Sequence, residues 1–391
     1  MNEKTQDNKK QFYAIDIIKF VFAFIVVAAH MFPFSSYSEK GDFLLVQGLA
    51  RIILPFFFIT AAFLFFRYSN ISLKEDPVLK KRLWRYIERM SILFFFWSLV
   101  INLFLALGWL LYGVKAGVFQ LLRSFFLPVG YALVINDTLF QVLPFSSAWR
   151  LASFKTFLFH LIQPFNQYHL WYFPALIFGL LFIYLRFRYV KPVFVLSLSM
   201  ALFVLGSLAD SYYGATASLP WLHKLTDIYL KMFETSRNGI FYGILFLAIG
   251  AFLARRPLYL KAKRARNLFI LFFIGLFVES GILKYYSWQR DYNFLYTAIP
   301  AAIFLFLWLK EVDLKEAGIY RKLREASVLI YCSHGLFVIL VPVLFNIFGF
   351  GSYIENSMVK FWLVFAITAG FSWAILWLEK FPRLKLLRYL H

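Results

Sequence analysis

Apolar runs of about 20 residues recur along the whole chain, and each is long enough to cross the roughly 30 Å hydrocarbon layer of a bilayer as a helix. A helix satisfies its own backbone hydrogen bonds, whereas a lipid-exposed loop cannot. The pattern predicts an all-α integral membrane protein with about ten transmembrane helices. The expected spans are 14–34, 43–66, 89–112, 169–185, 192–209, 238–254, 267–283, 292–309, 326–345 and 358–378.

The segment 113–168 is also apolar, but Gly, Pro and Asn interrupt it, as in LPVGYALVIND. We expect it to form interfacial or re-entrant helices on the outer side that cross the membrane zero or two times. No small-residue cleavage site follows the first run, so we expect an uncleaved first span. With no long polar stretch between runs, we expect a single membrane-embedded domain over 1–391 and no soluble domain.

The basic residues predict the orientation of these spans. With ten spans and a cytoplasmic N-terminus, the inside segments hold 27 Lys and Arg residues and the outside segments hold 10. Short cytoplasmic loops are typically enriched in Lys and Arg, so both termini are expected in the cytoplasm of a multi-pass cell-membrane protein. The net charge of +21 then faces anionic lipid head groups and requires no nucleic-acid partner.

Composition narrows the class further. Hydrophobic residues make up 61% of the chain and charged residues only 16%, which excludes an ordinary soluble globular domain. The single cysteine, Cys332, excludes an intrachain disulfide.

Ionisable side chains interrupt the first span, IDIIKFVFAFIVVAAHMF. Lys19 and His30 are 11 residues apart, so both lie on one helix face, roughly 16 Å apart along the axis. Asp16 precedes Lys19 by about one turn. Ionisable groups inside a membrane usually face a bundle interior or a wet cavity. The alternative is that Lys19 extends to the inner interface and His30 lies at the outer head groups.

A basic stretch, LKKRLWRYIERM, begins the third span and places Arg82 and Arg85 on one helix face. Two such guanidinium groups can bind phosphate oxygens in a forked geometry. Alternatively, the pair is only part of the positive-inside signal.

Four motifs occur in order on these spans. Lys19 is followed ten residues later by His30, and Arg82-x-x-Arg85 comes at the third span; HLWYFPALIFGLL and SVLIYCSHGLF lie on later spans. The chain resembles the acyltransferase 3 family in these motifs and over nearly its whole length. Members of that family are ten-span membrane enzymes that O-acylate cell-surface sugars and related acceptors.

The resemblance implies a donor and an acceptor on opposite sides of the membrane. The donor would be cytoplasmic acyl-CoA, most simply acetyl-CoA, bound by Arg82, Arg85 and Lys19. The catalytic residues would be on the first helix, with Lys19 and Asp16 near the cytoplasmic entrance and His30 as general base or acyl carrier. The acceptor would be an outer-face hydroxyl on a cell-surface glycan.

Other polar residues in the spans are weaker candidates for substrate binding. His334 would face the catalytic cavity or be a hydrogen-bonded core histidine, and Arg51 would hold an acceptor or form an internal ion pair. Glu279 is expected to be neutral, paired or near the acceptor. The remaining candidates are His169 and Arg237. No metal-ligand spacing such as H-x-x-x-H occurs, so no metal is expected.

A transporter is the alternative class. The chain also resembles the membrane module of membrane-bound serine racemases. A transporter of a sugar or small amino acid could use buried His, Lys and Glu side chains as substrate or proton sites. Binding and slow hydrolysis of labelled acetyl-CoA would distinguish an acyltransferase, since a transporter should do neither.

Overall fold

The computed structural model describes residues 11–67, 77–111, 169–187, 189–233, 235–256 and 258–391. The described residues form helices joined by irregular segments, without strands. The segment 113–168, for which we expected interfacial or re-entrant helices, lies outside them. The main helices are α2 (Tyr13–Met31), α3 (Glu39–Phe43), α4 (Ile53–Phe66), α5 (Pro77–Leu111), α10 (Tyr172–Phe187), α11 (Pro192–Leu208), α12 (Pro220–Phe233), α13 (Ile244–Arg255), α14 (Ala262–Tyr286), α15 (Ala298–Lys310), α16 (Gly318–Ile347) and α17 (Ser357–Leu378).

The hydropathy pattern located the helices well and their ends less well. Every expected span overlaps a helix. However, α5 begins at Pro77 rather than at 89, so the basic stretch is helical, and α15 begins at Ala298 rather than at 292. The loop expected over 210–237 contains α12. These differences arise because the predicted boundaries followed the ends of apolar runs, whereas α5 includes a basic stretch and α15 begins inside an apolar run.

Five helical stretches of the described chain are long and apolar enough to cross a membrane, namely Tyr13–Met31, Glu39–Phe66, Ala262–Tyr286, Gly318–Ile347 and Ser357–Leu378. Four further apolar helical stretches are shorter. On α14 the outward side chains are apolar, including Ile270, Ile274, Val278 and Ile282, and all are exposed. Such a continuous apolar face is compatible with lipid and not with water. The protein is therefore a multi-pass membrane protein.

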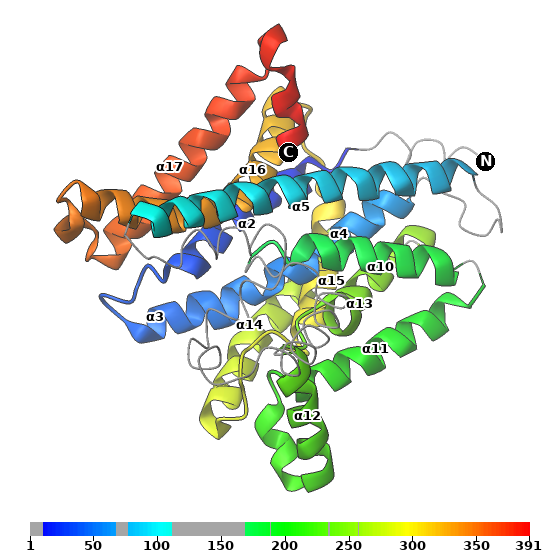
Figure 1. The fold of residues 1–391 in the computed structure, drawn as a ribbon. Helices are drawn as coiled ribbons and strands as arrows, with labels where there is room; N and C mark the ends of the chain where they lie inside the picture. Colours follow the sequence, from blue (N-terminus) through cyan, green and yellow to red (C-terminus); the bar gives the residue numbers. More distant parts are fainter. Residues whose placement is uncertain (1–10, 68–76, 112–168, 188, 234, 257) are drawn as a thin grey trace, which may run out of the picture.

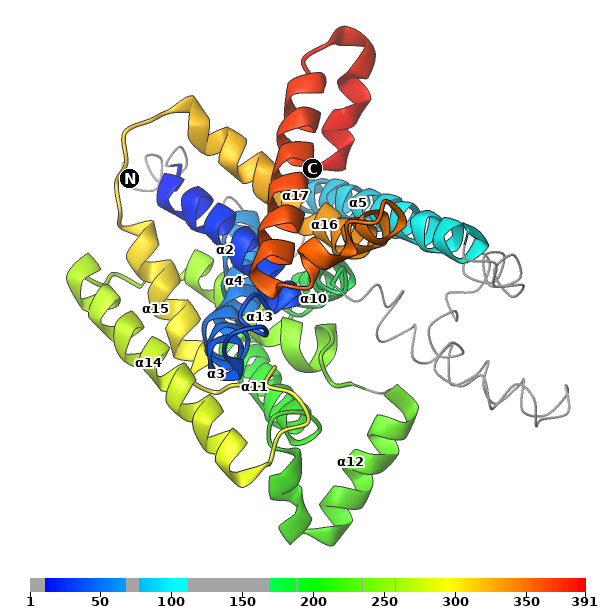
Figure 2. The same cartoon turned by 90° about the vertical axis from the view of Figure 1, so that its left-hand side faces the viewer.

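The interior of the helix bundle is formed by pairs of closely packed helices. α4 packs along α13, α2 along α16 and α14 along α15. At the α4–α13 contact a Cβ on Gly250 would lie 2.2 Å from the Ile59 carbonyl oxygen, so only glycine allows this approach. In both views the start of α2 and the end of the chain lie toward one end of the molecule, and α12 lies at the opposite end (Figures 1 and 2).

Two helices are irregular where they approach the bundle interior. Between α3 and α4 the chain forms a π-helical turn, η1 (Leu44–Gly48), and a 3₁₀ turn, η2 (Leu49–Ile52). A second π-helical turn, η4 (Gly239–Gly243), precedes α13 and is capped by the Asn238 side chain. Such turns rotate side chains relative to a regular helix and are frequent at functional sites. Here they flank the polar cavity described next.

Candidate active site

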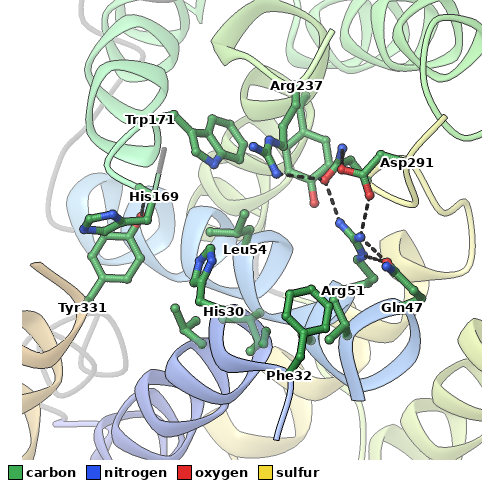
Figure 3. Close-up of a pocket in the computed structure, with 17 residues that line it drawn as sticks. His30, Phe32, Gln47, Arg51, Leu54, His169, Trp171, Arg237, Asp291 and Tyr331 are labelled. Atoms are coloured by element: carbon green, nitrogen blue, oxygen red, sulfur yellow. Dashed lines mark hydrogen bonds and ion pairs between the residues drawn. The ribbon is translucent and has the colours of Figure 1, made fainter. Parts of the chain in front are cut away.

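A polar cavity of about 210 Å³ lies among α2, η1, η2, the turn before α10, η4 and the loop before α15. We call it the histidine cavity. Figure 3 shows His30 between the pair His169–Tyr331 on one side and the guanidinium groups of Arg51 and Arg237 on the other. His30 is the second-last residue of α2, and Phe32 ends that helix in the left-handed conformation, with φ of 49°. The helix thus ends as it reaches the cavity.

Three histidine rings from separate segments meet beside this cavity. The ring centroid of His30 lies 5.2 Å from that of His334 and 6.4 Å from that of His169. The centroids of His169 and His334 are 4.5 Å apart. His334 is fully buried behind the other two and does not line the cavity. No group of His, Cys, Asp or Glu side chains in the described chain is arranged to hold a metal ion.

Hydrogen bonds orient the two histidines behind His30. Nδ1 of His334 lies 2.7 Å from the Tyr331 carbonyl oxygen, so this nitrogen donates and Nε2 is the acceptor. That Nε2 has no hydrogen-bond partner among the described residues. Nε2 of His169 lies 3.3 Å from the Cys332 carbonyl oxygen and donates to it. The Tyr331 hydroxyl donates to the His169 carbonyl over 2.5 Å, which ties the turn before α10 to α16.

Asn293 connects the charged groups at the other side of the cavity. Its Oδ1 accepts from Arg51 Nη1 at 2.7 Å and from Arg237 Nη1 at 3.4 Å. Its Nδ2 donates to Asp210 at 2.8 Å and to Asp291 at 2.9 Å. The amide therefore bridges the two arginines and the two carboxyl groups.

The two arginines of the cavity differ in their partners. Arg51 forms an ion pair with Asp291 at 2.7 Å and also donates to Gln47. Arg237 lies 5.3 Å from the centre of the Trp171 ring, and its Nε is buried without a hydrogen-bond partner in the described chain. Burial alone would raise the pKa of Asp291, but the guanidinium groups of Arg51 and Arg237 outweigh it and lower that pKa. Asp291 is thus held ionised.

A second cavity, of about 360 Å³, contains the residues predicted at the other end of α2. We call it the lysine cavity. Lys19, Arg82, Tyr86 and Tyr172 line it, and most of the remaining lining is apolar. Arg82 donates to the Leu64 carbonyl at 3.1 Å and lies 5.0 Å from the centre of the Phe65 ring. Tyr331 lines both this cavity and the histidine cavity.

Arg85 points elsewhere, into an open surface hollow of about 1120 Å³ that we call the arginine basin. Arg89, Arg321, Arg324 and Arg388 line it together with several glutamates. Arg324 also reaches Asp16, at 3.8 Å, one turn from Lys19. The predicted Arg82–Arg85 pair is therefore divided between the lysine cavity and the basin.

Glu279 does not line either cavity. Its carboxylate accepts from the backbone N–H groups of Tyr296 and Thr297 at 2.7 and 2.8 Å, and from the Tyr212 hydroxyl at 2.5 Å. These contacts cap the N-terminus of α15, where a negative charge is favourable. Glu279 was expected to be neutral, paired or near the acceptor. Its contacts are those of a carboxylate that is paired with hydrogen-bond donors.

Sequence reasoning missed Gln47, Tyr242, Asp291 and Asn293, all of which line the histidine cavity. Tyr331 was part of a recognised motif but had no assigned role. The signal that could have found two of them is the polar pair Asp291-x-Asn293 beside an expected span. Asn293 was instead counted inside that span, because an apolar average over a window conceals one amide.

The fold and the cavities define a multi-pass membrane protein with a histidine-lined cavity and a second cavity that share the residue Tyr331. Comparison with known proteins identifies its family. The acyltransferase 3 pattern, an acyltransferase domain, matches residues 12–377. This chain belongs to the acyltransferase 3 family.

Proteins that are similar to this chain in sequence are named as racemases. An amino-acid racemase of Enterococcus faecalis is 29% identical over 90% of this chain and 44% of its own length. A serine/alanine racemase of Enterococcus gallinarum is 25% identical over 91% of this chain and 45% of its own length. The chain thus spans less than half the length of these relatives. No solved structure matches the chain.

Proposed function

We propose that this protein is an O-acetyltransferase that moves an acetyl group from cytoplasmic acetyl-CoA to a hydroxyl of a cell-surface glycan outside the membrane. The observation that carries the proposal is the pair of cavities that meet at Tyr331. One contains Lys19 and Arg82 and the other contains His30, and both residues predicted at the two ends of the first span are accounted for. Acyltransferase activity fits the family to which the chain belongs.

The donor binds from the side of the arginine basin. Its phosphates are held by the basin's guanidinium groups, including Arg85, because charge-assisted contacts to phosphate are strong. The thioester arm follows the largely apolar lysine cavity past Lys19 and Arg82 to Tyr331. Asp16 balances part of the charge of Lys19 and Arg324.

The acceptor hydroxyl enters the histidine cavity and meets His30. The imidazole takes the hydroxyl proton, and the oxygen attacks the carbonyl carbon of the thioester. The carbon–sulfur bond then breaks, and the imidazolium returns the proton to the sulfur of the leaving CoA. Alternatively, His30 accepts the acetyl group first and passes it to the acceptor. The acceptor is positioned by Arg51, Arg237 and His169. His334 packs against the rings of His30 and His169 and helps to orient them.

We further propose that the chain forms ten spans in one membrane domain with both termini in the cytoplasm. The charge distribution supports this orientation, since 27 Lys and Arg residues lie in the segments assigned inside and 10 in those assigned outside. The location of the start of α2 and the end of the chain toward one end of the molecule also supports it (Figure 1).

Cysteine labelling tests the orientation. In a Cys332→Ser background, Lys263→Cys should not react with a membrane-impermeant maleimide in intact cells, because α14 begins on the cytoplasmic side. Lys40→Cys, at an exposed site in α3, is the control and should react. Cys332 is the single native cysteine, so each variant in this background carries one thiol. If position 263 is labelled and position 40 is not, the chain has the opposite orientation in the membrane, which would contradict the proposal.

Donor binding tests the reaction. Purified protein should bind labelled acetyl-CoA and hydrolyse it slowly. Arg82→Ala and Arg85→Ala should each weaken binding by about tenfold or more, since a contact with a charged group contributes roughly 1.5–3 kcal/mol. Added salt should weaken binding further, most of all at the open basin.

The matched control is Arg264→Ala, which removes an exposed arginine of the same assigned face that lines neither hollow. Its affinity should equal that of the wild type. Arg82→Lys should restore binding only in part, because lysine lacks the forked donor geometry. If the double variant Arg82→Ala/Arg85→Ala binds acetyl-CoA as the wild type does, the donor site lies elsewhere.

Transport of a sugar or small amino acid is the second candidate function. A cavity that presents both guanidinium groups and a carboxylate favours it, since such a cavity suits a solute with charges of both signs. A transporter would neither bind nor hydrolyse acetyl-CoA, so the same measurement separates the two functions.

A further inference from the structure

The charged residues of the histidine cavity are not balanced locally. Arg51, Arg237 and Asp291 line it. Arg51 and Asp291 neutralise each other at 2.7 Å. Asp210 does not line the cavity; it is buried behind Asn293 and accepts from the Asn293 backbone and side-chain N–H groups at 3.0 and 2.8 Å. Among the described residues that line the cavity, two arginines thus face one carboxylate, and that carboxylate forms its ion pair with Arg51 rather than with Arg237.

Arg237, whose charge helps to lower the pKa of Asp291, forms no ion pair with a described residue. Its only hydrogen bond to another side chain in the described chain is the 3.4 Å contact to the neutral amide of Asn293. Its Nε is buried and donates to no described residue. The Trp171 ring covers one face of the guanidinium group, which holds it in place but does not neutralise it. Buried charges without a partner are costly, and a ligand that supplies the opposite charge recovers that cost.

The position of Arg237 relative to His30 makes this charge relevant to the acceptor. Both side chains line the same cavity, Arg237 from the segment just before η4 and His30 from α2, and Figure 3 shows the guanidinium group across the cavity from the imidazole ring. An acceptor whose hydroxyl meets His30 therefore extends toward Arg237. Arg51, held by Gln47, Asp291 and Asn293, is less available.

We propose that the histidine cavity selects an acceptor that carries an anionic group, a carboxylate or a phosphate, which pairs with Arg237 while a hydroxyl of the same molecule faces His30. The proposal rests on the function proposed above, since it names the substrate class of the same site. It predicts that neutral sugars are poor ligands and that acidic sugars or phosphorylated sugars are good ones.

The test is a binding measurement that requires no acyl transfer. The full chain is placed in nanodiscs of neutral phosphatidylcholine, so that lipid head groups do not add net charge. Equilibrium dialysis then compares labelled D-glucuronate, D-glucose 6-phosphate and D-glucose. At least one of the two anions should bind about tenfold or more tightly than glucose. The tighter of the two identifies the carboxylate or the phosphate as the preferred group.

Variants assign the effect to Arg237. Arg237→Gln should abolish the preference for the anion, and Arg237→Lys, which keeps the charge, should retain most of it. Arg290→Gln is the matched control because it removes an exposed arginine near Asp291 that does not line the cavity. Its preference should be unchanged. Thermal unfolding of each variant checks that it is folded, and the lysine variant tests the proposal if the glutamine variant does not fold.

The outcomes separate this proposal from the proposed function. If neither anion binds more tightly than glucose, or if the preference survives in Arg237→Gln, the anion site is wrong, even where the same preparation binds acetyl-CoA. If the anion preference depends on Arg237 but acetyl-CoA does not bind, the anion site is supported and the acetyltransferase function is contradicted. That result would favour transport of an acidic solute.

Discussion

His30→Ala is expected to lower acetyl transfer by about 10²–10⁴-fold while leaving acetyl-CoA binding unchanged. The loss follows from removal of the base that takes the acceptor proton, and its size is that of general acid–base catalysis. Donor affinity should be maintained because His30 lines the histidine cavity and not the lysine cavity. The measurement is transfer of labelled acetyl from acetyl-CoA to the cell-surface polymer, at matched expression.

His223→Ala is the control for this variant. His223 lies in α12, hydrogen-bonded to Thr216 at 2.7 Å, and lines neither cavity. Its removal should leave the transfer rate close to that of the wild type. Transfer at the wild-type rate by His30→Ala would instead show that His30 is an interfacial histidine, and the catalytic role would pass to His169 or to His334.

Gly335→Ala is expected to have the second-largest effect, although it adds only one methyl group. The new Cβ would lie 2.0 Å from Cε1 of His169, so the ring must move. That ring is buried and packs 4.5 Å from His334 and 6.4 Å from His30, centroid to centroid. A displacement of about 1 Å near the reacting atoms can cost 10²-fold in rate, so we expect a loss of about that size in acetyl transfer.

Gly370→Ala separates this displacement from the general effect of a helical glycine. Gly370 lies in α17, and a Cβ there would meet no heavy atom within 4 Å. Both substitutions increase helix propensity by about 1 kcal/mol, so a difference between them reports the contact with His169. Thermal unfolding should remain close to that of the wild type for Gly370→Ala. A wild-type transfer rate for Gly335→Ala would show that the histidine arrangement is not needed for the reaction.

Helix positions could be predicted from the sequence because they depend on local properties. A run of apolar side chains is compatible with lipid wherever it occurs, and a helix is the one local structure that pairs its own backbone groups there. The spacing of Lys19 and His30 likewise required only the geometry of one helix, α2. The helix ends were less predictable, as at α15, where the loop before Ala298 contains Asn293.

The arrangement of the candidate site was decided by tertiary structure. The sequence by itself determined a multi-pass helical membrane protein, with Lys19 and His30 toward opposite ends of one helix and Arg82 and Arg85 at the start of another. Only the packing of α2, α16 and the turn before α10 brought three histidines together, and only the loop before α15 placed Asn293 between Arg51 and Arg237. The physical reason is that hydropathy and periodicity describe one helix at a time, whereas these contacts join residues that are far apart in the chain and depend on which side chains fit between packed helices.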